Sequence, residues 1–242
     1  MTKNFRAGLL AAVLVLPAAF ALPLAAATPE EEAAALSAAE KLLAQDPEKK
    51  VDVPACGALA ERLAVVPGPP AALARVQVLA RCLQGIDYEN REQPAVAALI
   101  AKLGDEVIFS EPSGQYYVSR QRIWDVYEKF KSHPLAEDLA WEAARTPAGG
   151  ECEGFLNCQL YDSLDSMGRY LELYPKGEHA AAALEELYWL HEEPSGVAPL
   201  EKGDKAQAKE MLAHWRKILG AVPGGQEQLK GVDKIAAAYK VK

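Results

Sequence analysis

Aromatic side chains are scarce in this sequence: Phe, Trp and Tyr together make up 7% of its 242 residues. Alternating runs of β-branched and aromatic residues, which are typical of half-buried strands, are also few. Alanine is abundant and recurs with leucine at the three- and four-residue spacing of a helix. These shortages argue against a sheet-rich body. The sequence predicts an all-α fold of stacked antiparallel helical hairpins.

Catalytic motifs are missing as well. The chain has no Gly-x-Ser-x-Gly turn, no phosphate-binding glycine loop and no His-Glu-x-x-His motif. No two of its four histidines stand at the spacing of metal ligands. We therefore expect no catalytic residue, no metal site and no cofactor. The four histidines are His133, His179, His191 and His214.

The first 27 residues have the three parts of a secretory signal. Lys3 and Arg6 supply positive charge, residues 8–24 form an uncharged apolar run, and three alanines precede Thr28. Cleavage before Thr28 is expected, which would leave a periplasmic or secreted chain with no membrane insertion. The alternative is an uncleaved membrane anchor, because the apolar run is long for a signal.

The charge of the chain is acidic. The full sequence has 26 basic and 34 acidic residues, a net charge of −8. Loss of Lys3 and Arg6 with the signal leaves 24 basic residues against the same 34 acidic ones, a net charge of −10. Such a surface repels nucleic-acid phosphates and anionic membranes, so neither is expected as a partner.

Four cysteines allow three disulfide pairings. Cys56 and Cys82 stand at nearly equal distances from the turn around Gly68, so antiparallel helices would bring them to the same height. Cys152 and Cys158 would close a short loop. An exported chain permits disulfides. Helix register therefore favours the pairs 56–82 and 152–158.

Residues 28–105 predict N-terminal helical hairpins. Thr28 is placed to cap the first helix, and Glu31 completes a capping box with it. Apolar residues then recur at helical spacing in three further segments. Their inward positions are Cys56, Leu59 and Leu63, then Val76, Ala80 and Leu83, and then Val96, Leu99, Ile100 and Leu103.

The pattern changes over residues 106–118. Val107-Ile108-Phe109 and Tyr116-Tyr117-Val118 lie on either side of a Pro-Ser-Gly turn signal. These residues are compatible with a short extended segment or a hairpin. We interpret the stretch as a structured linker rather than as a β domain.

Residues 119–191 carry the clearest helical pattern, four helices in two hairpins. In both hairpins a helix meets a proline, at Pro134 and at Pro175, and an alanine-rich helix follows after a short turn. The two prolines are 41 positions apart, within the range of helical repeats. The inward positions predicted for the four helices include Ile123 and Tyr127, Leu139 and Ala143, Leu160 and Leu171, and Ala183 and Leu187.

The run Tyr170-Leu171-Glu172-Leu173-Tyr174-Pro175, followed by the alanine-rich segment 180–184, carries a resemblance. It resembles the degenerate tetratricopeptide-like repeats of bacterial cell-envelope proteins, in particular the outer-membrane assembly lipoproteins. The full Trp-x-x-Leu-Gly-x-x-Tyr consensus of that family is absent. The resemblance implies helical hairpins and a protein partner in the cell envelope. An irregular helical bundle is the alternative.

Beyond the central block, residues 192–203 are predicted to form a loop and residues 204–242 a C-terminal pair of helices. Asp204 is expected to cap the first of them, and a Pro-Gly-Gly turn separates the two. Such a pair would cover the end of a stack of hairpins.

Two groups of residues are candidates for contact with a partner. The first is drawn from the aromatic residues of the central block, because interfaces are enriched in such side chains: Trp124, Trp141, Tyr161, Tyr170 and Trp189. Of these, Trp124, Trp141 and Tyr170 are the predicted binding residues. The second is the glycine-rich loop around Cys152, where Glu151 and Glu153 would form a stiffened acidic surface.

These patterns predict an exported, non-catalytic helical-repeat scaffold that mediates protein–protein interaction in the periplasm or cell envelope. One alternative is an exported helical hydrolase that acts on cell-wall sugar through Glu151 and Glu153. Acid–base hydrolysis needs two carboxyl groups held apart in unlike environments, which neighbours in sequence do not establish. Another alternative is a carrier of a small ligand or a metal.

Overall fold

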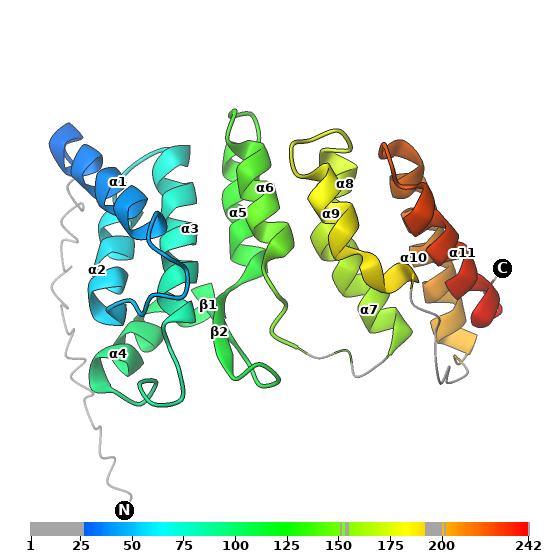
Figure 1. Ribbon diagram of the computed structural model, residues 1–242, viewed down its shortest axis with the longest axis horizontal. Coiled ribbons are helices and arrows are strands. Elements are labelled where there is room, and N and C mark those ends of the chain that lie inside the picture. The colour runs from blue at the N-terminus through cyan, green and yellow to red at the C-terminus, as the bar shows by residue number, and fades with distance from the viewer. Residues whose placement is uncertain (1–26, 151, 153–154, 192–199, 201, 242) are drawn as a thin grey trace, which may run out of the picture.

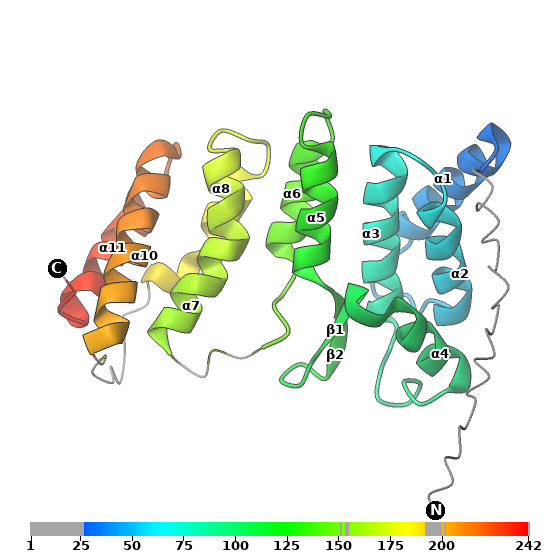
Figure 2. The same ribbon diagram turned by 180° about the vertical axis from the view of Figure 1, so that it is seen from behind.

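A computed structural model of the chain describes residues 27–150, 152, 155–191, 200 and 202–241. These residues are mostly helical, and their helices stand side by side in a row that runs from the N-terminal to the C-terminal end (Figure 1). The view from behind shows the same order (Figure 2). The prediction of a mostly helical chain is confirmed.

The N-terminal part of the row holds four helices. Thr28 Oγ1 accepts a hydrogen bond from the Glu31 backbone N–H at 3.3 Å, and Glu31 Oε2 accepts one from Thr28 N at 2.8 Å, so the predicted capping box is present. Gly68 turns the chain between the second and third helices at φ +96°, a conformation that favours glycine. The helices are α1 (Pro29–Leu43), α2 (Val53–Ala64), α3 (Pro69–Gln84) and α4 (Pro94–Leu103).

A buried arginine fixes the turn between α1 and α2. Arg81 of α3 is 9% exposed, and its guanidinium donates hydrogen bonds to the backbone carbonyls of Asp46, Pro47 and Lys49. These bonds satisfy backbone acceptors that no helix uses. The N-terminal unit therefore combines an apolar core with one polar anchor.

Both predicted disulfides are present in the structure. Cys56 and Cys82 join α2 to α3 with a Cα–Cα distance of 5.6 Å, as the helix register predicts. Cys152 and Cys158 are joined with a Cα–Cα distance of 5.2 Å. In the described part of the chain no cysteine is free.

Residues 107–118 form an antiparallel hairpin of two strands, β1 (Val107–Ser110) and β2 (Gln115–Val118). Val107 pairs with Val118 and Ser110 with Gln115. Val107 and Val118 are buried, and β2 lies against α3. The stretch thus contains the extended hairpin with which its sequence is compatible, between the N-terminal helices and the central block.

The central block contains two turns between helices, and the two turns share one backbone pattern. In the first turn His133 N donates to Phe130 O and Ala136 N donates to His133 O. In the second turn Gly177 N donates to Tyr174 O, and Ala180 N donates to Gly177 O. The helices are α5 (Arg120–Phe130) and α6 (Ala136–Arg145), then α7 (Leu156–Ser163), α8 (Arg169–Leu173) and α9 (Ala180–Glu186), followed by a 3₁₀ turn (Tyr188–His191).

The equivalent positions of the two turns are 44 residues apart, since Ala136 corresponds to Ala180. The two prolines are 41 residues apart, so Pro134 and Pro175 occupy different places in their turns. Tyr174 directly precedes Pro175 and lies just past the end of α8, as expected because the residue before a proline is disfavoured in the α conformation. The helix α5 already ends at Phe130, four residues before Pro134. The hairpins are alike in backbone, but the proline spacing is not their repeat length.

The third predicted helix of the central block is interrupted by a π-helical turn (Leu164–Gly168), which joins α7 to α8. Ser163 Oγ donates to Gln159 O at 2.7 Å, and Ser166 Oγ donates to Asp162 O at 2.8 Å. Hydroxyls that bond carbonyls four residues back compete with the helical ladder. Helical spacing of the apolar residues alone did not indicate this turn.

Two long helices end the row, α10 (Lys202–Ala221) and α11 (Gln226–Ala238). They pack against each other, and α10 also packs on α7. Asp204 was expected to cap α10, but the helix begins two residues earlier, so Asp204 lies in its first turn. Most of the predicted 192–203 loop lies outside the described residues.

Candidate interaction surface

The junction between the two central hairpins is built around Trp124, a predicted binding residue. Its side chain lies on the inward face of α5 and is 0% exposed. The indole Nε1–H donates to Asp165 O in the π-helical turn at 3.2 Å. The Arg169 guanidinium lies 4.0 Å from the centre of the indole ring. In this conformation Trp124 joins two hairpins and offers no surface to a partner.

Arg120 forms a second tie across the same junction. Its residue is 8% exposed, and its Nε–H donates to Thr146 O at 2.8 Å. Its guanidinium also bonds Asp162 Oδ1 at 2.6 Å and lies 3.8 Å from Asp165 Oδ2. Burial raises the pKa of Asp165 above its ordinary value, although the nearby Arg120 and Arg169 oppose the rise.

A layer of aromatic side chains continues the junction toward the hairpin turns. The rings of Trp141 and Tyr170 have centres 5.5 Å apart, and His179 stacks on Trp141 with centres 4.8 Å apart and planes at 8°. Tyr170, which is 0% exposed, donates its hydroxyl to Glu137 Oε1 at 2.7 Å. Burial and the bond to Glu137 raise the pKa of Tyr170. This layer packs α6 against α8.

The Glu137 carboxylate also fixes the second turn. Glu137 Oε1 accepts a hydrogen bond from Glu178 N at 2.5 Å, and Tyr170 Oη accepts one from His179 N at 3.1 Å. A Cβ added at Gly177 would overlap Glu137 Oε1 and lie 2.7 Å from Tyr170 Oη. Glycine at position 177 therefore allows the close approach of the turn to α6.

The structure separates the five predicted contact residues. Trp141 is partly exposed, whereas Trp124 and Tyr170 lie in the interior. Their helical positions face the neighbouring hairpin, which a sequence pattern could not show. Glu151 and Glu153 lie outside the described residues, and so does the acidic surface predicted for them.

Three other aromatic side chains are more exposed than these, and of the three only Tyr161 belonged to the aromatic group from which the binding residues were predicted. Phe155 is 68% exposed and directly precedes α7. Tyr161 is 65% exposed and lies within α7. Tyr188 is 64% exposed in the 3₁₀ turn. Sequence position alone gave no signal for Tyr161: it directly follows the inward Leu160, but Trp124 directly follows the inward Ile123 and is buried.

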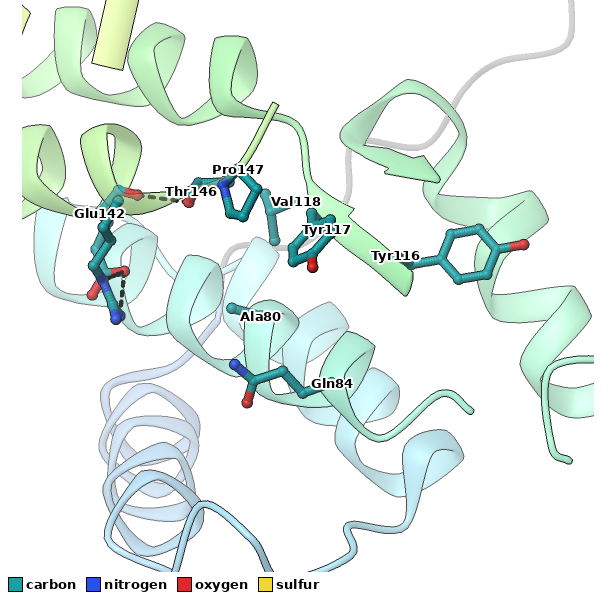
Figure 3. A pocket seen from close by; sticks show the side chains of 9 residues that line it. Ala80, Gln84, Tyr116, Tyr117, Val118, Glu142, Thr146 and Pro147 are labelled. Carbon is teal, nitrogen blue, oxygen red and sulfur yellow. Dashed lines mark hydrogen bonds and ion pairs between the residues drawn. The ribbon is translucent and has the colours of Figure 1, made fainter. Parts of the chain in front are cut away.

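An open cleft of about 260 Å³ lies between α3, β2 and the end of α6. Tyr117, Val118 and Pro147 lie over Ala80 and Gln84 of α3, while the ring of Tyr116 points away (Figure 3). This volume is smaller than the roughly 300–1,000 Å³ of typical small-molecule sites.

Glu142, which also lines this cleft, is 6% exposed. Its carboxylate accepts hydrogen bonds from Gln77 Nε2 at 2.7 Å and from Arg145 Nε at 2.8 Å. Thr146 Oγ1 donates to the Glu142 backbone carbonyl at 2.7 Å. The ion pair with Arg145 lies within α6, and the hydrogen bond from Gln77 joins α6 to α3, so this carboxylate has structural partners on both helices.

Among the residues that the structure describes, no group of three or more His, Cys, Asp or Glu side chains is placed to hold a metal ion. Two histidines approach carboxylates: His179 Nε2 lies 3.8 Å from Asp138 Oδ1, and His214 Nε2 lies 3.0 Å from Glu172 Oε2. Over the same described residues, no helix has the length and hydropathy needed to span a membrane.

Comparisons of the chain with known protein families, with curated proteins and with solved structures gave no match.

Proposed function

We propose that this chain is an exported, non-catalytic protein of helical repeats, tetratricopeptide-like in its middle, which binds another protein in the cell envelope. The observation that carries the proposal is the contrast between buried and exposed aromatic side chains. Trp124 and Tyr170 are buried in the interior, while Phe155 and Tyr161 are more than half exposed on one short segment. Large exposed aromatic rings are enriched where one protein binds another.

The position of these two rings supports a binding role. Cys158 lies between Phe155 and Tyr161 in the sequence, and its disulfide to Cys152 restrains the entry to α7. A contact surface that is held in place before binding loses less conformational entropy when a partner docks. The half-buried stack of Trp141 and His179 adds a further aromatic surface on the neighbouring hairpin.

The net charge of the chain indicates which kind of partner it would attract. A mature net charge of −10 attracts proteins with a basic surface and repels acidic ones. We therefore expect a partner that presents an apolar groove or patch for the two rings, surrounded by lysine or arginine.

Export is the other part of the proposal. The capping box that starts α1 uses atoms of Thr28 and Glu31 alone, so cleavage before Thr28 would leave it in place. The mass of the mature protein isolated from an exporting cell tests this point. A chain that begins at Thr28 is expected, and a chain that retains residues 1–27 would contradict cleavage.

Binding is tested by affinity capture from cell-envelope extract with three forms of the protein: the unaltered chain, the double variant Phe155→Ser/Tyr161→Ser, and Tyr88→Ser. Tyr88 is 80% exposed in the N-terminal part, so its variant is a matched control for loss of an exposed ring. A specific partner should be retained by the unaltered chain and by Tyr88→Ser, and its recovery should fall at least about tenfold with the double variant. Equal recovery of the partner with all three forms would show that Phe155 and Tyr161 do not form the binding surface.

A further inference from the structure

The two disulfides of this chain differ in their exposure to solvent. Cys56 and Cys82 are 4% and 0% exposed between α2 and α3, whereas Cys158 is exposed and Cys152 is partly exposed. Thiol–disulfide exchange begins when a thiolate attacks one sulfur of the bond, so the rate depends on access to that sulfur. The first disulfide can be attacked only after the α2–α3 core opens, while the second is open to attack in the folded protein.

The place of Cys158 in its helix adds a second, independent feature. Cys158 is the third residue of α7, which has eight residues. Backbone N–H groups in the first turn of a helix have no partner within the helix, and together with the helix dipole they stabilise a negative charge. Cysteines at such positions have a lowered thiol pKa and are good leaving groups in exchange.

We propose that Cys152–Cys158 is a thiol–disulfide exchange site whose substrate is a dithiol reductant. One thiolate of the dithiol attacks the Cys158 sulfur, the Cys152–Cys158 bond breaks, and Cys152 leaves as a thiolate that takes up a proton. The second thiolate of the dithiol then attacks the dithiol sulfur of the mixed disulfide, and Cys158 leaves. Two electrons and two protons pass to the protein, and the dithiol becomes a disulfide.

The fold can tolerate this reduction, because other bonds hold the same connection. Arg120 binds Thr146 O on one side of the bridged turn and Asp162 on the other. The Phe155 backbone N–H donates to Cys152 O at 2.7 Å. These contacts do not depend on the sulfur–sulfur bond, so the reduced protein should keep its helices and be able to reoxidise.

The test compares the two disulfides in one sample of the folded chain. The protein is treated with dithiothreitol for increasing times, quenched with N-ethylmaleimide and digested for mass spectrometry. Cys152 and Cys158 should be modified at least about tenfold faster than Cys56 and Cys82. The circular dichroism of the selectively reduced protein should keep its helical signal. Equal rates for the two pairs, or loss of helix together with the first modification, would overturn the proposal.

A second measurement tests the role of the helix. After selective reduction, the rate of alkylation of each thiol by iodoacetamide is followed against pH. Cys158 should reach half its maximal rate at a pH below the roughly 8.5 of an ordinary thiol, and below the midpoint of Cys152. If the midpoints of Cys152 and Cys158 coincide, the N-terminus of α7 does not stabilise the Cys158 thiolate. The same chain unfolded in guanidinium is the control, in which all four thiols should behave alike.

Discussion

Two buried tryptophans lie against the π-helical turn that joins α7 to α8, and they differ in their hydrogen bonds. Trp124 of α5 donates its indole N–H to Asp165 O, whereas the Trp215 indole N–H is buried without a hydrogen-bond partner among the described residues. Trp215 of α10 packs so closely that a Cβ added at Gly168 would lie 3.2 Å from its ring. The same short segment is thus contacted by one bonded and one unbonded indole.

The difference shows two ways to join helical hairpins. The junction of α5 and α6 with α7 and α8 adds partly buried polar bonds to its apolar packing, from Trp124, Arg120 and Glu137. Directional bonds of this kind fix the relative orientation of packed elements, since misplacement leaves buried groups unpaired. The junction with α10 places an apolar contact at its centre and ion pairs at its surface, at Glu172.

The largest effect is expected from removing the ring at the first junction. Trp124→Ala should lower the free energy of unfolding by about 3–5 kcal/mol, because it leaves a cavity and removes the bond to Asp165 O. Tyr88→Ala, which removes an exposed ring, should change it by less than about 0.5 kcal/mol. Chemical denaturation followed by circular dichroism measures both. A small effect at Trp124 would mean that the junction does not contribute to global stability.

The next largest effect on stability is expected from crowding the hydrogen bond between Glu137 and Tyr170 at the second turn. Gly177→Ala places a Cβ against the Glu137 carboxylate and the Tyr170 hydroxyl, and should cost about 1–3 kcal/mol. Gly150→Ala is the control, because a Cβ added there meets nothing within 4 Å. Thermal and denaturant unfolding of the two variants would show the contrast. Similar stabilities would contradict the close approach of the turn to α6.

Replacement of each buried indole by phenylalanine removes the indole N–H and keeps an aromatic ring in its place. Trp124→Phe leaves Asp165 O without its donor, whereas Trp215→Phe removes a donor that has no partner. Both variants lose similar ring volume, so Trp124→Phe should be the less stable by about 1 kcal/mol. Paired denaturation curves measure the difference. If Trp215→Phe were the less stable of the two, packing alone would decide both junctions.

The smallest effect is expected at the surface of the second junction. A hydrogen bond from Lys217, and then one from His214, hold the pKa of Glu172 below its ordinary value. A carboxyl with a lowered pKa stabilises the fold above its unfolded pKa of about 4.3, and that contribution is lost as the pH falls through the folded pKa.

Glu172→Gln should therefore lower stability near pH 7 and have little effect below about pH 4. Its side chain is 40% exposed, and solvent screening limits the change to less than about 0.5 kcal/mol. Urea denaturation of both proteins between pH 3 and pH 7 measures it. An unchanged difference across that range would show that the ion pairs do not couple to folding.

The elements of this fold were largely predictable because their signals are local. A capping box at Thr28, proline stops and glycine turns each act within a few residues of the chain. The pairing of Cys56 with Cys82 followed from the same logic, since a short turn between two helices fixes their register. The repeat length did not follow, because Pro134 and Pro175 occupy different places in turns of the same geometry.

The candidate surface was less predictable, and Trp124, Tyr170 and Tyr161 show why. All three are aromatic residues of central helices, and residue type alone does not show which of them are buried. Trp124 and Tyr170 face the neighbouring hairpin and are buried, while Tyr161 faces solvent. Helical spacing identifies an inward stripe on one helix, but which further residues are covered depends on the helices that pack beside it.

By itself the sequence determined the helical class, the capped start of α1 and the two disulfide pairs, since hydrogen bonding and turn geometry over a few residues decide these. Only the tertiary structure decided which aromatic rings remain at the surface, that α7 and α8 meet in a π-helical turn, and that Cys158 is exposed while Cys82 is buried. These features arise from contacts between segments distant in the chain. No local pattern of residues encodes such contacts one by one.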